Sequence, residues 1–150
     1  MIRIFIFTLL FSTSIFAAST ESTDTSASDQ VNKLYDKAYD LVYAKKFDKS
    51  LKLLKKIAKR DDLGEMKADV YNLLGFSYRK NDNPNLDKAL ESYKIALEAN
   101  PEHLGAHEYL GELYLKLGDK FMAEKMLAKL ETIAGTGSDE YKKLKKAIAN

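Results

Sequence analysis

One segment, residues 68–101, constrains the fold of this chain most strongly, because it reads as two helices joined by a turn. Three- and four-residue spacing places four side chains of its first half on one helix face: Tyr71, Leu74, Gly75 and Tyr78. Pro84 lies in a stretch rich in turn formers and disfavours continuation of that helix. A second apolar stripe follows, and Pro101 closes the unit. The segment therefore predicts helices over residues 66–80 and 86–99.

Gly75 lies in the middle of the first of these helices. A glycine in a helix interior costs roughly 1 kcal/mol relative to alanine. Its presence therefore indicates a place where a neighbouring helix approaches closely. We expect Ala89, the small residue of the second helix, to lie opposite Gly75.

The same pattern recurs on both sides of this segment. The stretch FDKSL at Phe47 matches LDKAL at Leu86, and Ala38 and Gly111 stand where Gly75 stands. The three small residues are 37 and 36 residues apart. The pattern divides the chain into repeats of about 31–64, 68–101 and 104–135. A last helix at 138–149 begins at Ser138 and carries an apolar stripe beside a lysine-rich face, as the end of a repeat array requires.

These features resemble the tetratricopeptide repeat (TPR) signature, W-x2-L-G-x2-Y, then A-x3-F, then P, with Tyr71 in the Trp place and Tyr93 in the Phe place. The resemblance implies an all-α fold: a right-handed superhelix of three helix-turn-helix repeats with a C-terminal capping helix. We expect helices near 31–44, 47–60, 66–80, 86–99, 102–117, 119–133 and 138–149. The C-terminal layout is similar to small exported bacterial TPR proteins, some of which carry a cysteine pair where Ala134 and Ser138 stand here.

In this family the first helix of each repeat lines a concave surface, so the resemblance implies a binding groove. Carried onto this chain, the groove residues are Asn32, Tyr35, Tyr39, Val42, Asn72, Phe76, Arg79, Glu108, Glu112 and Leu115. Aromatic and arginine side chains are typical of binding hot spots. The other interpretation is that Tyr35 and Tyr39 pack on the linker or a neighbouring helix. The family's clamp for peptide carboxylates is not matched in this chain. Tyrosines occupy positions 35 and 39 in the first repeat, and Gly105 and Tyr109 occupy the positions in the third repeat.

The first 18 residues have the parts of a secretory signal peptide: a positive charge at Arg3, an apolar run and small residues near 17–19, where cleavage is expected. An uncleaved anchor or a buried helix are the alternatives. Residues 19–30 are polar and small and predict a flexible linker before a TPR domain over 31–150. We therefore expect an exported protein, in the periplasm of a Gram-negative cell, with no stable membrane insertion after cleavage.

The sequence offers little for catalysis or metal binding. His103 and His107 have a spacing that suits a metal, but packing or helix capping explains both without one. The chain has no cysteine, and its net charge of +2 is too small to predict nucleic-acid binding. No motif for a nucleophile, a phosphate loop or a cofactor is present. We expect no enzyme activity, no cofactor and no resident metal.

The function predicted from these features is a non-enzymatic scaffold outside the cytoplasm that holds a protein or peptide segment in its concave groove. The alternative is a structural protein that self-associates, with the groove or one end of the array buried in a homo-oligomer.

Overall fold

The computed structural model describes residues 22–150, which fold into seven helices with no strand in that range. The helices are α1 (Ser22–Tyr43), α2 (Phe47–Ile57), α3 (Met66–Lys80), α4 (Leu86–Ala99), α5 (Leu104–Lys116), α6 (Lys120–Ala134) and α7 (Asp139–Ala149). None of the helices in this part of the chain is long and apolar enough to cross a membrane. The signal peptide predicted at residues 1–18 lies outside the described residues.

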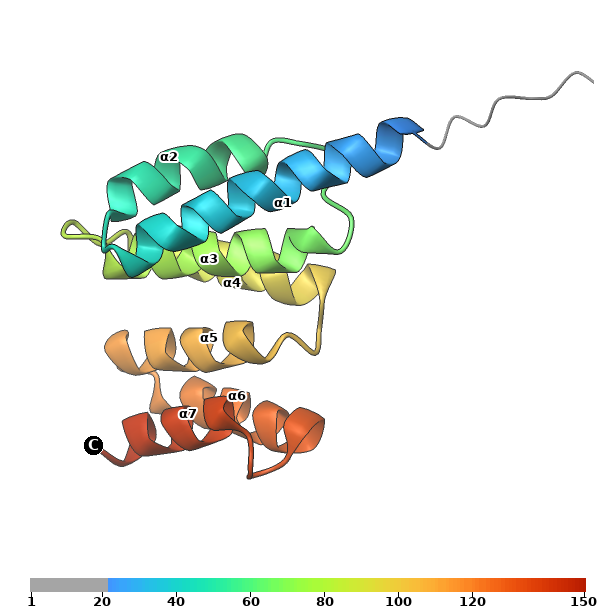
Figure 1. Ribbon diagram of the computed structural model, residues 1–150. Coiled ribbons are helices and arrows are strands. Elements are labelled where there is room, and N and C mark those ends of the chain that lie inside the picture. Colours follow the sequence, from blue (N-terminus) through green and yellow to red (C-terminus); the bar gives the residue numbers. More distant parts are fainter. Residues whose placement is uncertain (1–21) are drawn as a thin grey trace, which may run out of the picture.

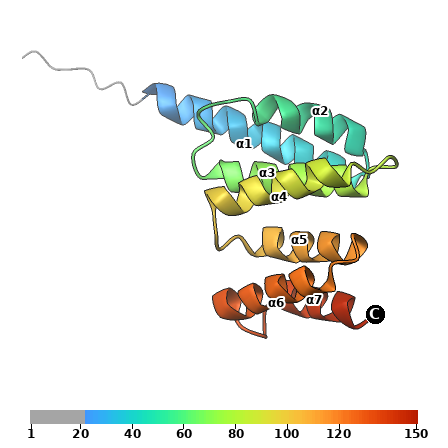
Figure 2. The ribbon, with the colours of Figure 1, turned by 180° about the vertical axis from the view of Figure 1, so that it is seen from behind.

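Consecutive helices pack in pairs, α1 with α2, α3 with α4 and α5 with α6. The pairs follow one another along one axis: α1 and α2 form one end, α3 and α4 the middle, and α5, α6 and α7 the other end (Figures 1 and 2). Helix α3 also contacts α1 and α5, so the first helices of the three repeats lie side by side. The predicted all-α repeat array with a C-terminal capping helix is confirmed.

Helix α1 begins at Ser22 rather than at Val31, so the linker predicted for residues 19–30 is helical from Ser22 onward. The prediction rested on the lack of large apolar side chains. It gave too little weight to propagation, which adds one hydrogen bond per residue once a helix has formed further along. Residues 22–30 contain no Gly or Pro to stop it.

The glycine in α3 does permit a close helix contact, but its neighbour is not the one predicted. A Cβ atom at Gly75 would lie 2.7 Å from Cε1 of Tyr93, so the aromatic ring of α4 occupies the space that a side chain would need. Ala89 is fully buried in the same cluster, one turn earlier in α4. The flat ring fills the gap between the two helices better than a methyl group does, and Tyr93 itself is fully buried.

Gly111 plays the corresponding part in the third repeat. A Cβ atom there would lie 2.5 Å from Cδ2 of Leu144, a buried residue of α7. Leu144 also packs with Leu130 of α6 and Tyr141. Helix α7 therefore sits on the end of the array as a first helix of a further repeat would, which confirms its capping role.

Side chains at the helix starts fix several boundaries. Asn85, His103, Asp119 and Ser138 each accept a hydrogen bond from a backbone N–H in the first turn of α4, α5, α6 and α7. The Nδ1 atom of His103 accepts from Ala106 N–H at 3.1 Å, which confirms its capping role. Because His103 is the cap, α5 begins at Leu104 rather than at residue 102.

A buried carboxyl group lies under the capping helix. Glu108 of α5 is 4% exposed, and its Oε2 atom is 3.7 Å from Nζ of Lys143 on α7. Burial is the main cause that raises the pKa of Glu108, to about 7. Glu112 and Glu140 raise it further, whereas Lys143 and Arg79 oppose the shift. Glu108 is therefore partly protonated near neutral pH.

We predict that Gly75→Leu lowers the free energy of unfolding by about 3 kcal/mol or more, because the new side chain must displace the Tyr93 ring. Thermal unfolding followed by circular dichroism measures the change. Gly137→Ala is the control, since a Cβ at Gly137 would meet no described atom within 4 Å. An unfolding midpoint for Gly75→Leu equal to that of the control would show that the α3–α4 contact is placed wrongly.

Glu108 predicts a pH dependence of stability. Its pKa in the folded state, about 7, lies above its ordinary value of 4.5, so the folded state holds the proton more tightly than the unfolded state does. This contribution to stability is complete below pH 4.5 and is lost as the pH rises through 7. We expect Glu108→Gln to remove that loss and to raise Tm by about 5 °C at pH 8. Melting curves at pH 5 and pH 8 test this, and an equal effect of the substitution at both pH values would contradict it.

Candidate functional site

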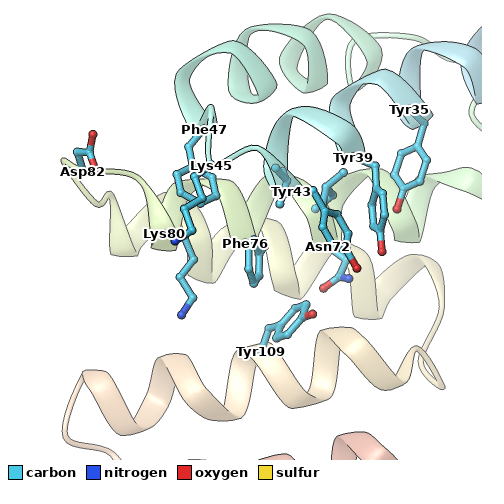
Figure 3. Close-up of a pocket in the computed structure, with 12 residues that line it drawn as sticks. Tyr35, Tyr39, Tyr43, Lys45, Phe47, Asn72, Phe76, Lys80, Asp82 and Tyr109 are labelled. Atoms are coloured by element: carbon cyan, nitrogen blue, oxygen red, sulfur yellow. The ribbon is translucent and has the colours of Figure 1, made fainter.

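A groove of about 660 Å³ opens between α1, α3 and α5, on the side formed by the first helices of the repeats. Figure 3 shows its lining residues, which come from α1, from α3 and its following loop, from the start of α2, and from α5. They are Tyr35, Tyr39, Val42, Tyr43, Lys45, Phe47, Asn72, Leu73, Phe76, Lys80, Asp82 and Tyr109. We call this the inner groove. Its volume is within the range of ligand-binding clefts.

Three tyrosines of α1 form one wall of the inner groove. Tyr35, Tyr39 and Tyr43 are spaced four residues apart, so they share one helix face, and their neighbouring ring centroids are 6.3 and 5.0 Å apart. Tyr39 is 43% exposed and Tyr43 is 74% exposed. Tyr35 is half-buried, and burial raises the pKa of its phenol well above the ordinary value, so its hydroxyl stays protonated. The wall therefore presents hydroxyl groups and aromatic faces.

A second set of aromatic rings runs across the floor from one repeat to the next. The ring centroid of Phe76 is 6.4 Å from that of Phe47 on α2 and 5.0 Å from that of Tyr109 on α5. Burial raises the pKa of Tyr109 to about 12. These rings join all three repeats in one apolar surface, with tilted geometries that aromatic pairs favour.

Arg79 was predicted to line the groove, but it lies beneath the floor. It is 6% exposed, and its guanidinium carbon is 5.5 Å from the ring centroids of both Phe76 and Tyr109. Its Nη1 is 2.7 Å from Oε2 of Glu112, and its Nε donates to the Tyr93 hydroxyl at 3.3 Å. Burial lowers the pKa of Arg79, but Tyr93 and Glu112 raise it more, so Arg79 stays charged. Arg79 therefore supports the rings from below and is paired with the partly exposed Glu112, while Nη2 of Arg79 has no hydrogen-bond partner among the described residues.

The other predicted site residues divide into two groups. Tyr35, Tyr39, Asn72 and Phe76 do line the inner groove, as does Val42. Asn32 is exposed and is not part of the lining, and Glu108 is buried under α7. Both were wrong as lining residues because a repeat pattern gives the helix face, but not how far the groove extends or which neighbouring helix covers it.

Several lining residues were missed from the sequence. Tyr43 continues the four-residue spacing of Tyr35 and Tyr39, which was a signal that could have found it. Tyr109 was considered only as a departure from the carboxylate clamp, although that comparison already placed it on the groove side of the third repeat. Lys45, Phe47 and Asp82 belong to turns or to the start of a second helix, and Lys80 ends α3. The resemblance to TPR proteins predicted groove residues only from the first helix of each repeat.

Asn72 of α3 belongs to the lining and is drawn close to Tyr39 and Tyr43 (Figure 3). Its Oδ1 atom has no hydrogen-bond donor among the residues that the structure describes. That oxygen is buried, so a change in the Asn72 side-chain conformation is needed before it can accept a hydrogen bond from a bound molecule.

The two histidines are engaged within the fold. Nε2 of His103 lies 3.1 Å from Oδ1 of Asp69, and Nε2 of His107 lies 2.8 Å from the carbonyl oxygen of Pro101. Within residues 22–150, no three His, Cys, Asp or Glu residues come together in an arrangement that could hold a metal ion. The histidines therefore serve capping and packing.

Comparison with known proteins identifies the architecture. The family model described as tetratricopeptide repeat matches residues 82–120. No curated protein sequence matches the chain significantly.

Solved structures of low sequence identity share the fold. The type III secretion chaperone SycD of Yersinia enterocolitica has 19% identity and a TM-score of 0.66, covering 81% of this chain and 88% of its own. PcrH has 21% identity and a TM-score of 0.66, covering 81% and 87%. The first TPR of Spaghetti (RPAP3) has 16% identity and a TM-score of 0.65, covering 82% and 96%. The family model over residues 82–120, the stacked helix pairs and these structures show that the chain has a tetratricopeptide-type repeat fold.

Proposed function

We propose that this chain is a non-enzymatic binding module that holds an extended protein segment in its inner groove. The observation that carries the proposal is the set of aromatic side chains that line the groove, of which Tyr39 and Tyr43 are exposed and Phe76 is half-buried. Exposed aromatic side chains in a concave surface are typical of protein-binding sites. The same rings are not needed to close the helix pairs, whose contacts are made by Tyr93 and Leu144.

Structures with this fold support the proposal. The SycD structure is of a complex with a peptide of the translocator YopD, and the PcrH structure is of a complex with the chaperone-binding region of PopD. The RPAP3 domain is bound to an HSP90 peptide, SRMEEVD. By analogy of fold, we assign peptide binding to this chain and leave the partner's identity open.

The groove is suited to bind without rearrangement. Its walls are helices fixed by the buried contacts of Gly75 and by the ion pair of Arg79 with Glu112, so little ordering of the protein opposes association. The aromatic faces take apolar side chains of the segment, and a change in the Asn72 side chain, with the helices unmoved, lets its amide oxygen accept from a backbone N–H group. The groove therefore recognises a segment through its apolar side chains and its extended backbone.

Because residues 1–18 read as a secretory signal peptide, we propose that this binding takes place outside the cytoplasmic membrane, in the periplasm. We predict that the mature protein in a periplasmic fraction begins near residues 18–20, because small residues mark the cleavage site at 17–19. Intact-mass measurement of the protein isolated from that fraction tests this. Recovery of the full-length chain from the cytoplasmic fraction alone would contradict it.

We predict that Tyr39→Ala combined with Phe76→Ala weakens partner binding at least tenfold while the chain stays helical, since two hot-spot rings are removed from a preformed scaffold. Affinity capture from periplasmic extract with residues 20–150, followed by titration of the captured protein, measures this. Phe121→Ala is the matched control, because Phe121 is 65% exposed but lies on α6, outside the groove.

Equal capture by the double variant and by the control would contradict binding in the groove. Light scattering at increasing concentration tests the second candidate, self-association. A tight dimer that the Tyr39/Phe76 variant breaks would show that a second copy, and not a foreign segment, fills the groove.

A further inference from the structure

Charged side chains are distributed unevenly along the inner groove. Lys45, Lys80 and Asp82 lie at one end, beside Phe47, whereas Tyr35 and Tyr39 lie at the other (Figure 3). The lysine-bearing end continues into a smaller hollow whose charged residues are Lys45, Lys46, Asp48, Lys49 and Asp82. Cations therefore outnumber carboxylates at this end.

Few groups within the protein neutralise these positive charges. Neither Lys45 nor Lys80 forms an ion pair within 4.0 Å among the described residues. Nζ of Lys80 lies 5.9 Å from the Phe76 ring centroid, so the ammonium borders the apolar floor. Asp48, a nearby carboxylate, accepts a hydrogen bond from Nδ2 of Asn81 at 2.7 Å. The two ammonium groups are thus available to an anionic group beside an apolar side chain.

The backbone of Lys45 gives an independent reason to assign it a role. Its φ is +54°, in the left-handed region that favours glycine. The corresponding turn of the third repeat has Gly118 there, with φ +81°. The hydrogen bonds of the two turns correspond as well: Lys45 N–H donates to Val42 O, and Gly118 N–H donates to Leu115 O. The same turn therefore accepts glycine in one repeat and holds a strained lysine in the repeat that lines the groove.

We propose that the inner groove selects protein segments in which apolar residues are followed by acidic residues, and that Lys45 and Lys80 bind the acidic part. This inference rests on the proposed function and specifies its ligand. Lys45 is the main specificity residue, because a glycine at its position would suit the turn better but would carry no charge. The positions differ from those of the carboxylate clamp, which this chain does not match.

A protein segment fits these features better than a nucleic acid does. The floor is formed by aromatic rings tilted against one another, and carboxylates of Asp48 and Asp82 border the basic end. A polyphosphate backbone would meet those carboxylates repeatedly, whereas one short acidic stretch can be placed between the lysines.

The test uses residues 20–150 and three fluorescent synthetic peptides with the same Leu- and Phe-containing core. One continues into a run of Glu, one into Gln and one into Lys. We expect the Glu peptide to bind roughly fivefold more tightly than the Gln peptide at low salt, and the Lys peptide to bind more weakly than either. Added salt should reduce the differences, because these charges are exposed.

Variants locate the preference. Lys45→Gly should raise Tm by about 2 to 4 °C, because the turn is relieved of strain, and yet weaken binding of the Glu peptide roughly threefold. Lys45→Arg should retain binding. Asp82→Asn should strengthen it, which is a change of opposite sign. Lys52→Gln, an equal loss of charge on an exposed position of α2 away from the groove, is the control.

Equal binding of the Glu and Gln peptides, or a preference that survives Lys45→Gly and Lys80→Gln together, would overturn the assignment and leave groove binding intact. If no core peptide binds while the Tyr39/Phe76 variant also captures the same proteins as the wild type, the proposed function itself fails. Displacement of the Glu peptide by a single-stranded oligonucleotide more strongly than by poly-glutamate would overturn the choice of a protein ligand.

Discussion

The close contact between a glycine of one helix and a large side chain of the next is the constraint on which this fold depends. At Gly75 the partner is the ring of Tyr93, and at Gly111 it is Leu144 of the capping helix. Each contact buries the large side chain completely. Because these contacts close the helix pairs and the end of the array, the exposed faces of α1, α3 and α5 are released from packing. The aromatic residues of the groove can therefore vary with function without loss of the scaffold.

Buried polar groups add order to that scaffold. The guanidinium of Arg79 links α3 to Glu112 of α5 and to the Tyr93 hydroxyl, and it lies against the rings that form the groove floor. Loss of one partner of such a buried pair leaves a charge without compensation, so the rings and the ion pair are expected to act as one unit. The buried ion pair and the apolar contacts between the helices therefore both hold the groove residues in position. Such support favours a binding surface formed before its ligand arrives.

The repeats and most helices could be predicted from the sequence. The helical spacing of apolar residues and the positions of turn residues are local properties, and packing between repeats reinforces them. The sequence predicted Tyr35, Tyr39, Asn72 and Phe76 as lining residues, because a helix face follows directly from spacing. It could not place Arg79, Glu108 and Glu112, whose surroundings depend on side chains of other helices. The correspondence of Lys45 with Gly118 follows from the register that aligns Ala38 with Gly111, but the left-handed conformation of Lys45 itself was seen only in the structure. The early start of α1 reflects propagation of a helix through residues of weak preference.

The central claim is that the inner groove, and not the outer surface of the array, is where a protein segment binds. Nuclear magnetic resonance of residues 20–150 tests it most directly, with the segment of a captured partner added in steps. The account predicts the largest shift changes at the Asn72 side-chain amide and at the rings of Tyr39, Phe76 and Tyr109, with small changes at Phe121. Changes concentrated on α2, α4 and α6, with the Asn72 amide unaffected, would contradict it.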